Sequence, residues 1–241
     1  MRLPVIQGII KRRLLVNFRI DPDVMKRQLP SRFVPKLQGG FAIAGICLIR
    51  LEKIRPRFVP AFASISSENA AHRVAVAWKT DAGEKKEGVF IPRRDTGSSI
   101  NSFAGGRVFP GEHHKAGFEI KETHEAIDLR MNSKDGKVAI HVAGRFGGAM
   151  PISSCFPDVE SASRFFEPGA LGYSVTSQPG RLDGIELRTK SWKMEPLQVS
   201  AVSSSYFSDE KMFPRGSVTF DCALLMRDIA HEWHCAEDLY V

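Results

Sequence analysis

The stretch GVFIPRRDTGSSINSFAGGRVFPGEHHKAGFEI, residues 88–120, places many ionisable side chains between two apolar segments. Its start, residues 89–91, predicts a buried strand that ends at Pro92, and a second strand is expected to begin near Ala116. Between them lie two arginines and an aspartate, a Gly/Ser-rich segment, the pair Gly105-Gly106, and the Glu-His-His-Lys cluster 112–115. Glycines let a backbone approach a ligand closely, and apolar neighbours change the proton affinity of charged groups. We therefore expect any small-molecule chemistry of this chain to centre here.

Strand patterns recur at roughly ten-residue spacing on both sides of this stretch. RLLVNFRI (13–20), FAIAGICLIRL (41–51) and HRVAVAWKT (72–80) precede it, and the second of these is apolar enough for burial on both faces. VAIHVAGRF (138–146) follows an Asp135-Gly136 turn that is typical of a hairpin. Because strands and helices do not alternate, a doubly wound fold is not expected. The pattern favours a single α+β domain over residues 1–241, mainly β, built as a barrel or a sandwich with a few short helices.

Two short helices and a terminal tail complete the expected elements. DPDVMKRQLP (21–30) predicts a helix with Asp21 as N-cap and Pro30 as its stop. FPDVESASRFFEPG (156–169) predicts a second helix with Asp158 as N-cap. Residues 229–235, which include His231 and His234, are expected to form an exposed or loosely docked end.

Composition and charge exclude several classes of protein. The 241 residues contain 43% hydrophobic and 25% charged residues, which is ordinary for a globular protein. No apolar run reaches about 18 residues, and the N-terminus lacks the order of a secretory signal, so we expect a cytoplasmic location and no membrane partner. The net charge of +7 is scattered rather than gathered in a basic stripe with interleaved aromatics, so a nucleic-acid partner is not favoured. An anionic small ligand would use the positive charge equally well.

Metal and cofactor motifs are not evident. The four cysteines, at positions 47, 155, 222 and 235, are far apart and are expected to be reduced and mostly buried. His113 and His114 are adjacent, so in a strand they point to opposite faces and cannot line one site together. The Gly105-Gly106-Arg107 segment lacks the dinucleotide pattern. We predict no metal and no cofactor.

Charged residues at strand ends are the remaining candidates. Glu68 and Arg73 flank residues 69–72 just before an apolar strand, and Arg93-Arg94-Asp95 follow one. Such residues are commonly solvated, but if the strand ends converge on a cavity, an arginine there would hold a carboxylate and Glu68 would accept a proton. Lys115 is either a surface lysine or, if desolvated, an amine able to form a Schiff base with a ketone.

Three segments carry a family resemblance. LLVNFRIDPDVMKRQLPSRFVPKL (14–37), AGGRVFP (104–110) and VSAVSSSYFSDEKMFPRGSVTFD (199–221) together resemble the acetoacetate decarboxylase-like superfamily, and most closely its branch of uncharacterised bacterial proteins. The resemblance covers about residues 10–225. It implies an antiparallel, cone-shaped β-barrel that encloses a small-molecule cavity, in a homo-oligomer. In the decarboxylases of the family a catalytic lysine directly follows the proline, whereas here Gly111 follows Pro110 and Lys115 comes four positions late.

The resemblance therefore implies the pocket more strongly than the reaction. The leading hypothesis is a barrel that binds a small anionic organic molecule, with the decarboxylase lysine displaced. In this hypothesis an arginine binds the anion, and His114 or Glu68 donates and accepts protons. One alternative is a lyase that forms a Schiff base with a β-keto acid through Lys115, and another is a basic β domain that binds nucleic acid. Whether the protein is an enzyme stays open. The candidate site residues are Glu68, Arg73, Arg93, Arg107, His113, His114 and Lys115.

Overall fold

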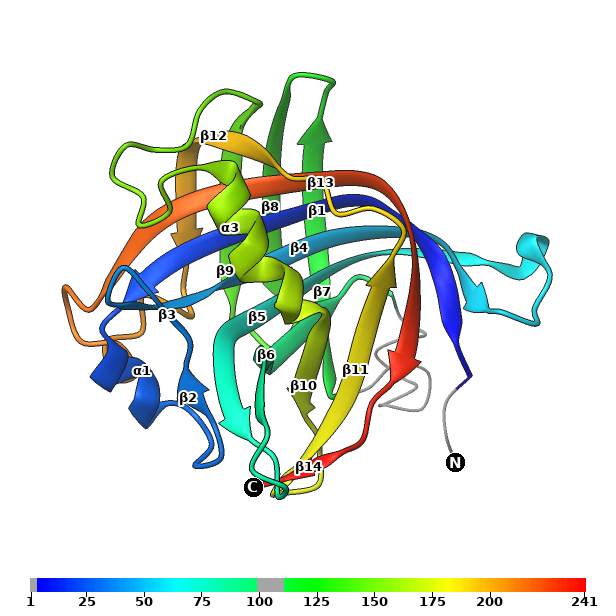
Figure 1. Cartoon of the computed structure of the whole chain (residues 1–241). Helices are drawn as coiled ribbons and strands as arrows, with labels where there is room; N and C mark the ends of the chain where they lie inside the picture. Colours follow the sequence, from blue (N-terminus) through cyan, green and yellow to red (C-terminus); the bar gives the residue numbers. More distant parts are fainter. Residues whose placement is uncertain (1–3, 99–110) are drawn as a thin grey trace.

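Long, curved strands make up most of the molecule (Figure 1). The structure, a computed structural model, describes residues 4–98 and 111–241. The strands are β1 (Ile6–Ile20), β2 (Val34–Pro35), β3 (Leu37–Gln38), β4 (Phe41–Pro56), β5 (Ile65–Lys79), β6 (Lys85–Thr96), β7 (His113–Glu122), β8 (Ala126–Ser133), β9 (Ala139–Phe146), β10 (Leu171–Val175), β11 (Arg181–Thr189), β12 (Glu195–Ser204), β13 (Val218–Cys235) and β14 (Leu239–Tyr240). The helices are α1 (Pro22–Arg27) and α3 (Val159–Phe166), with 3-10 turns η1 (Ala61–Ala63) and η2 (Glu167–Ala170). The mainly β prediction is confirmed.

The sheet closes on itself along two paths. In the described chain its order is β14-β11-β10-β6-β7-β8-β9-β12-β13-β1-β4-β5-β2, and β11 also pairs with β13 while β6 also pairs with β5. These two extra pairings close a small ring, which consists of β1, β4, β5, β6, β10, β11 and β13. They also close a large ring, which consists of β1, β4, β5, β6, β7, β8, β9, β12 and β13. The strands common to both rings are therefore covered on both faces.

Burial on both faces explains the near-continuous apolar runs of β1 and β4. On β1, Leu14 and Val16 pack into one core cluster, whereas Ile10 and Leu15 pack into the other. The second cluster also contains Phe165 of α3, which crosses the long strands in Figure 1. A bulge between Ile10 and Arg12 shifts the alternation of β1, so that Arg13 and Leu15 continue the face of Ile10.

Both predicted helices are present with the predicted caps. The Asp21 side chain accepts hydrogen bonds from the backbone amides of Asp23 and Val24 at the start of α1. Asp158 accepts from the backbone amide of Ser161 and forms a reciprocal capping box at the start of α3. These caps are local signals, which is why the sequence was sufficient to predict them.

Two expectations about strand arrangement are wrong. The sheet is not wholly antiparallel, because β6 runs parallel to both β7 and β10. Alternation of side chains gives no strand direction, so the sequence pattern could not distinguish these pairs. The C-terminal residues 229–235 are not loosely docked but belong to β13, where they pair with β1 and β11, and His231 is only 4% exposed. None of the described helices has the length and apolar character needed to cross a membrane.

Candidate functional site

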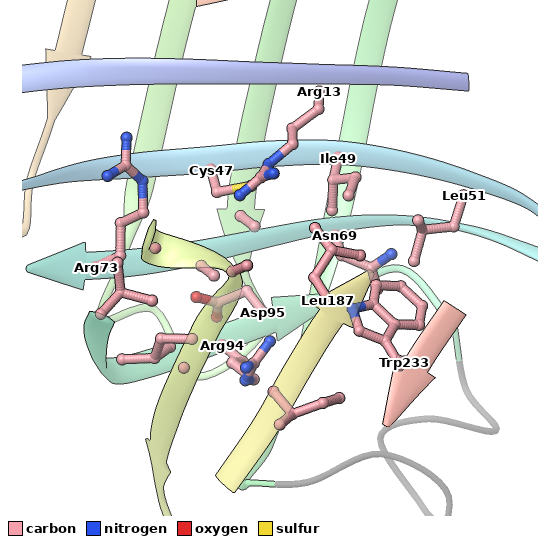
Figure 2. Close-up of a pocket in the computed structure, with 18 of the residues that line it drawn as sticks. Arg13, Cys47, Ile49, Leu51, Asn69, Arg73, Arg94, Asp95, Leu187 and Trp233 are labelled. Carbon is pink, nitrogen blue, oxygen red and sulfur yellow. The ribbon is translucent and has the colours of Figure 1, made fainter. Parts of the chain in front are cut away.

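A cavity of about 120 Å³ lies within the small ring (Figure 2). All seven strands of that ring contribute to its lining, together with His113 of β7 and the turn η2. Its wall is largely apolar and includes Ile49, Leu51, Val89, Ile91, Leu187 and Trp233. The bulge in β1 sets which of its side chains face this space, whereas the β4 residues of the lining follow simple alternation. The ring therefore provides a partly open hollow with a largely apolar wall, and charges beside such a wall interact more strongly than at the surface.

Three arginines contribute to the lining of this cavity from three different strands: Arg13 of β1, Arg73 of β5 and Arg94 of β6. In Figure 2 the Arg73 guanidinium points away from Arg94. Arg73 is 4% exposed, its Nη2 donates to Asn17 Oδ1 at 2.5 Å, and its guanidinium carbon lies 4.8 Å from the centre of the Phe166 ring. Burial lowers the pKa of Arg73 to about 10. At neutral pH it still carries its charge, so the fold holds a cation inside an apolar wall.

Arg13 and Arg94 have similar surroundings. Arg13 is 9% exposed and its Nε donates to Cys47 Sγ at 3.4 Å. Arg94 donates from Nε to the Ser174 hydroxyl at 2.9 Å, and desolvation lowers its pKa to about 10 although part of its surface remains accessible. No ion pair between described residues includes Arg13, Arg73 or Arg94. Within residues 4–98 and 111–241, these three arginines of the lining therefore have no ion-paired carboxylate.

The other polar groups of the lining do not cancel this charge. Asp95 is fully buried, but its carboxylate is bonded to Arg93 at 2.8 Å. His113 Nδ1 lies 3.1 Å from the Gly111 carbonyl, and burial with nearby Arg94 lowers the pKa of His113 to about 3. His113 is therefore neutral at physiological pH, and the cavity has a net positive character suited to an anion.

Of the six predicted site residues that the structure describes, two contribute to the cavity. Arg73 and His113 contribute to its lining, whereas the described lining does not include Glu68, Arg93, His114 or Lys115. Lys115 pairs with Thr96 and lies two positions after His113 on β7, so the alternation of the strand places both on one face. Arg107 lies outside the described residues.

The remaining predicted residues belong to two separate clusters. Glu68 is bonded to the buried guanidinium of Arg12 at 2.7 Å, and burial raises the pKa of Glu68. Arg93 bridges Asp95 and Asp135, and His114 Nδ1 lies 3.7 Å from Asp135. In both clusters carboxylates already balance the arginine, which is the arrangement of a structural ion pair.

Sequence reasoning did not select Arg13, Arg94 or Cys47 as site residues. Arg94 stood in the Arg93-Arg94-Asp95 group, but only the strand geometry shows that Arg93 and Arg94 point to different surroundings. Arg13 opens an apolar strand, RLLVNFRI, and this burial is a signal that could have identified it. Within residues 4–98 and 111–241, no group of three or more His, Cys, Asp or Glu side chains is placed to hold a metal ion.

Comparison with solved structures defines the class of fold. The chain superposes on acetoacetate decarboxylase from Legionella pneumophila with a TM-score of 0.60 at 11% identity, covering 98% of this chain and 88% of that chain. It matches an acetoacetate decarboxylase-like enzyme from Sphingomonas wittichii RW1 with a TM-score of 0.59 at 11% identity, covering 100% and 94%. It also matches the enduracididine biosynthesis enzyme MppR complexed with pyruvate, with a TM-score of 0.59 at 10% identity, covering 100% and 91%. The fold is thus that of acetoacetate decarboxylase and its relatives, as the sequence resemblance predicted.

The family is narrower than the fold. Residues 10–223 match the family model DUF2071, described as an uncharacterized conserved protein, and the chain belongs to this family. No protein with a curated description matches the chain.

Proposed function

We propose that the chain binds a small organic acid in the cavity of the small ring, with Arg13, Arg73 and Arg94 holding the carboxylate. The observation that carries this proposal is the set of three arginines that contribute to the lining of one largely apolar cavity and have no ion-paired carboxylate among the described residues. Keeping such charges buried costs stability, and an anionic ligand that bonds to them would offset this cost. We also propose that the closed sheet is the cone-shaped barrel implied by the resemblance.

The size of the cavity favours a short acid. Its volume of about 120 Å³ is well below the roughly 300 Å³ at which sites for drug-sized ligands begin. A protein of similar fold, MppR, is known in complex with pyruvate, which is an acid of this size. A nucleotide or a nucleic acid would not enter such a space. Self-association and a cytoplasmic location remain predictions.

Calorimetric titration with pyruvate, acetoacetate and acetate, against the neutral analogue acetone, tests the proposal. We expect the acids to bind and acetone not to bind. The Arg94→Gln variant should bind the acids about 10- to 100-fold more weakly, because a hydrogen bond to a charged group contributes about 1.5–3 kcal/mol. Arg188→Gln is the matched control, since Arg188 is exposed on β11 and bonded to Glu186. Equal affinity for acetone, or an equal loss in the control, would contradict the proposal.

A second candidate function is Schiff-base chemistry at Lys115. The placement of Lys115 on the same face of β7 as His113 supports it. In this reaction the amine adds to the ketone of a β-keto acid and water leaves, which gives an imine. Borohydride with acetoacetate would then leave a reduced adduct on Lys115 that mass spectrometry detects. Tight binding of acetoacetate without any adduct would support the binding function alone.

A further inference from the structure

The connection between β4 and β5 projects from the body of the molecule as an arm (Figure 1). Its tip, residues 57–63, reads RFVPAFA, so six of its seven residues are apolar. All of them except Val59 are exposed, and Phe58 and Phe62 are 78% and 92% exposed. A contiguous exposed apolar surface marks a site of contact with a protein or a membrane. The arm is therefore a candidate interaction surface.

The tip is held in place by hydrogen bonds of its own. Arg55 Nε, on the last turn of chain before the tip, donates to the Val59 carbonyl at 3.0 Å. The Val59 amide donates to the Pro56 carbonyl at 2.9 Å, and the Ala63 amide donates to the Pro60 carbonyl at 3.1 Å. These bonds fold the tip back on itself without the support of a neighbouring strand. The two phenylalanines are thus presented to the surroundings by a preformed loop.

A basic cleft lies at the base of the arm, where the ends of β1, β4, β11 and β13 pair side by side. The charged residues of its lining are four basic ones and one acidic one: Lys53, Arg55, Arg188, Lys190 and Glu232. Arg188 is paired with Glu186 at 2.7 Å, whereas no ion pair between described residues includes Lys53, Arg55 or Lys190. Arg57 of the tip is itself 70% exposed and lies 3.9 Å from Glu232. The apolar tip therefore stands directly in front of an excess of positive charge.

This order of groups, apolar at the tip and cationic behind it, matches an anionic lipid surface. A projecting tip enters a fluid interface without needing a pocket of matching shape, and cations behind it then lie at the level of the headgroup phosphates. A second copy of the chain carries the same net charge of +7, which opposes its approach to the basic cleft. A single-stranded nucleic acid would stack on the aromatic rings but would leave the aliphatic residues of the tip uncovered.

We propose that the arm docks the protein on an anionic membrane surface. Phe58 and Phe62 enter the interface, while Lys53, Arg55 and Lys190 attract the headgroup phosphates. The lack of a long apolar run, from which the sequence predicted no membrane partner, concerns a segment that spans the bilayer, and a loop that lies in the interface needs no such run. The inference does not depend on the proposed function of the cavity.

Co-flotation of the full chain with vesicles tests the proposal. One set of vesicles mixes phosphatidylglycerol with phosphatidylcholine, and the other contains phosphatidylcholine alone. We expect the protein to float with the anionic vesicles and to remain unbound with the neutral ones. Raising the salt concentration from about 0.1 M to about 1 M shortens the Debye length from about 10 Å to about 3 Å, so it should weaken the binding. Equal binding to the two sets, or no binding to either, would overturn the proposal.

Matched variants separate the apolar tip from the basic cleft. Phe58→Ser and Phe62→Ser should each weaken binding to the anionic vesicles by about tenfold, because each removes an aromatic side chain that leaves water. Ile152→Ser is the control for the phenylalanines, since Ile152 is also fully exposed but lies between β9 and α3. Lys53→Gln and Lys190→Gln should each weaken binding by about fivefold, while Lys211→Gln, at an exposed site between β12 and β13, should not. Losses as large in the controls would overturn the proposal.

A gain of signal reports insertion of the tip directly. Phe62→Trp places an indole at the tip, and its fluorescence, taken as the difference from the unaltered protein, should shift to shorter wavelength when anionic vesicles are added. Ile152→Trp should show no shift. Light scattering of the unaltered protein and of Phe62→Ser covers the remaining partner. If Phe62→Ser converts an oligomer to a monomer and the vesicles leave the Phe62→Trp signal unchanged, the arm is an interface between copies and the proposal is overturned.

Discussion

Replacing His72 with leucine should make the protein markedly more resistant to acid. His72 is fully buried on β5, and neither of its ring nitrogens has a hydrogen-bond partner in the described structure. Its ring packs 4.4 Å from that of Tyr206. Burial, with a smaller effect of Arg93, lowers the pKa of His72 from 6.5 to about 3.

The size of the effect follows from this pKa. Below pH 6.5 the unfolded chain takes up a proton at His72 that the folded chain does not take up until about pH 3. The free energy of unfolding therefore falls by about 1.36 kcal/mol for each pH unit within this window. Between pH 6.5 and about pH 4.5 the loss amounts to about 2.7 kcal/mol. His72→Leu removes this loss, whereas the effects of other histidines are common to both proteins.

Urea unfolding at pH 7 and at about pH 4.5 measures the effect. The stability difference between His72→Leu and the unaltered protein should shift in favour of the variant by about 2.7 kcal/mol on acidification, whatever its sign at pH 7. His124→Leu is the control, since the His124 side chain is 90% exposed, and its stability difference should stay nearly constant. A stability difference for His72→Leu that does not change with pH would refute the reasoning. Because the protein loses stability below pH 6.5, ligand binding to the cavity should be measured near pH 7 or higher.

Three further substitutions test the strands and the helix that support the cavity. Gly45→Ala on β4 would place a Cβ 2.2 Å from the Val16 carbonyl oxygen of β1, so it should destabilise the protein by more than about 2 kcal/mol in urea unfolding. Gly117→Ala is the control, because the nearest neighbour of its Cβ would be Lys134 Nζ at 4.0 Å, and its stability should change by less than about 0.5 kcal/mol. Asp158→Ala should remove the N-cap of α3 and lower the stability of the protein by about 1 kcal/mol, which thermal unfolding measures. Glu160→Ala, at an exposed position of the same helix, is the control and should change the stability little. Arg12→Met should lower the free energy of unfolding by about 3–5 kcal/mol, because it leaves the carboxylates of Glu68 and Glu122 without their buried partner. A smaller loss in urea unfolding would mean that solvent already screens these ion pairs.

The sequence predicted what local rules determine. Asp21 and Asp158 cap their helices through contacts within three residues, and the apolar run of β4 indicates burial on both faces without knowledge of its neighbours. The resemblance placed the fold correctly because it rests on the order of several segments. Arg73 was selected because it lies with Glu68 just before an apolar strand, and in the structure it contributes to the cavity lining.

The rest of the site depends on information that alternation does not contain. One additional residue in a strand reverses which side chains face inward, and such a bulge between Ile10 and Arg12 brings Arg13 to the face of Ile10. The small ring closes through the pairing of β11 with β13, which are separated by β12, and the pairing of β13 with β1 joins the two ends of the chain. No local pattern distinguishes His231, buried in that pairing, from a histidine in a solvated tail.

The strands common to both rings have a consequence for how ligand preference can change. Two consecutive residues of β5 have different surroundings: His72 packs against Tyr206, whereas Arg73 contributes to the cavity lining. Inserting or deleting one residue in β5 would exchange these surroundings and disturb both. We expect related chains to tune their ligands by single replacements at these positions, and to vary in length only where the chain leaves the shared strands.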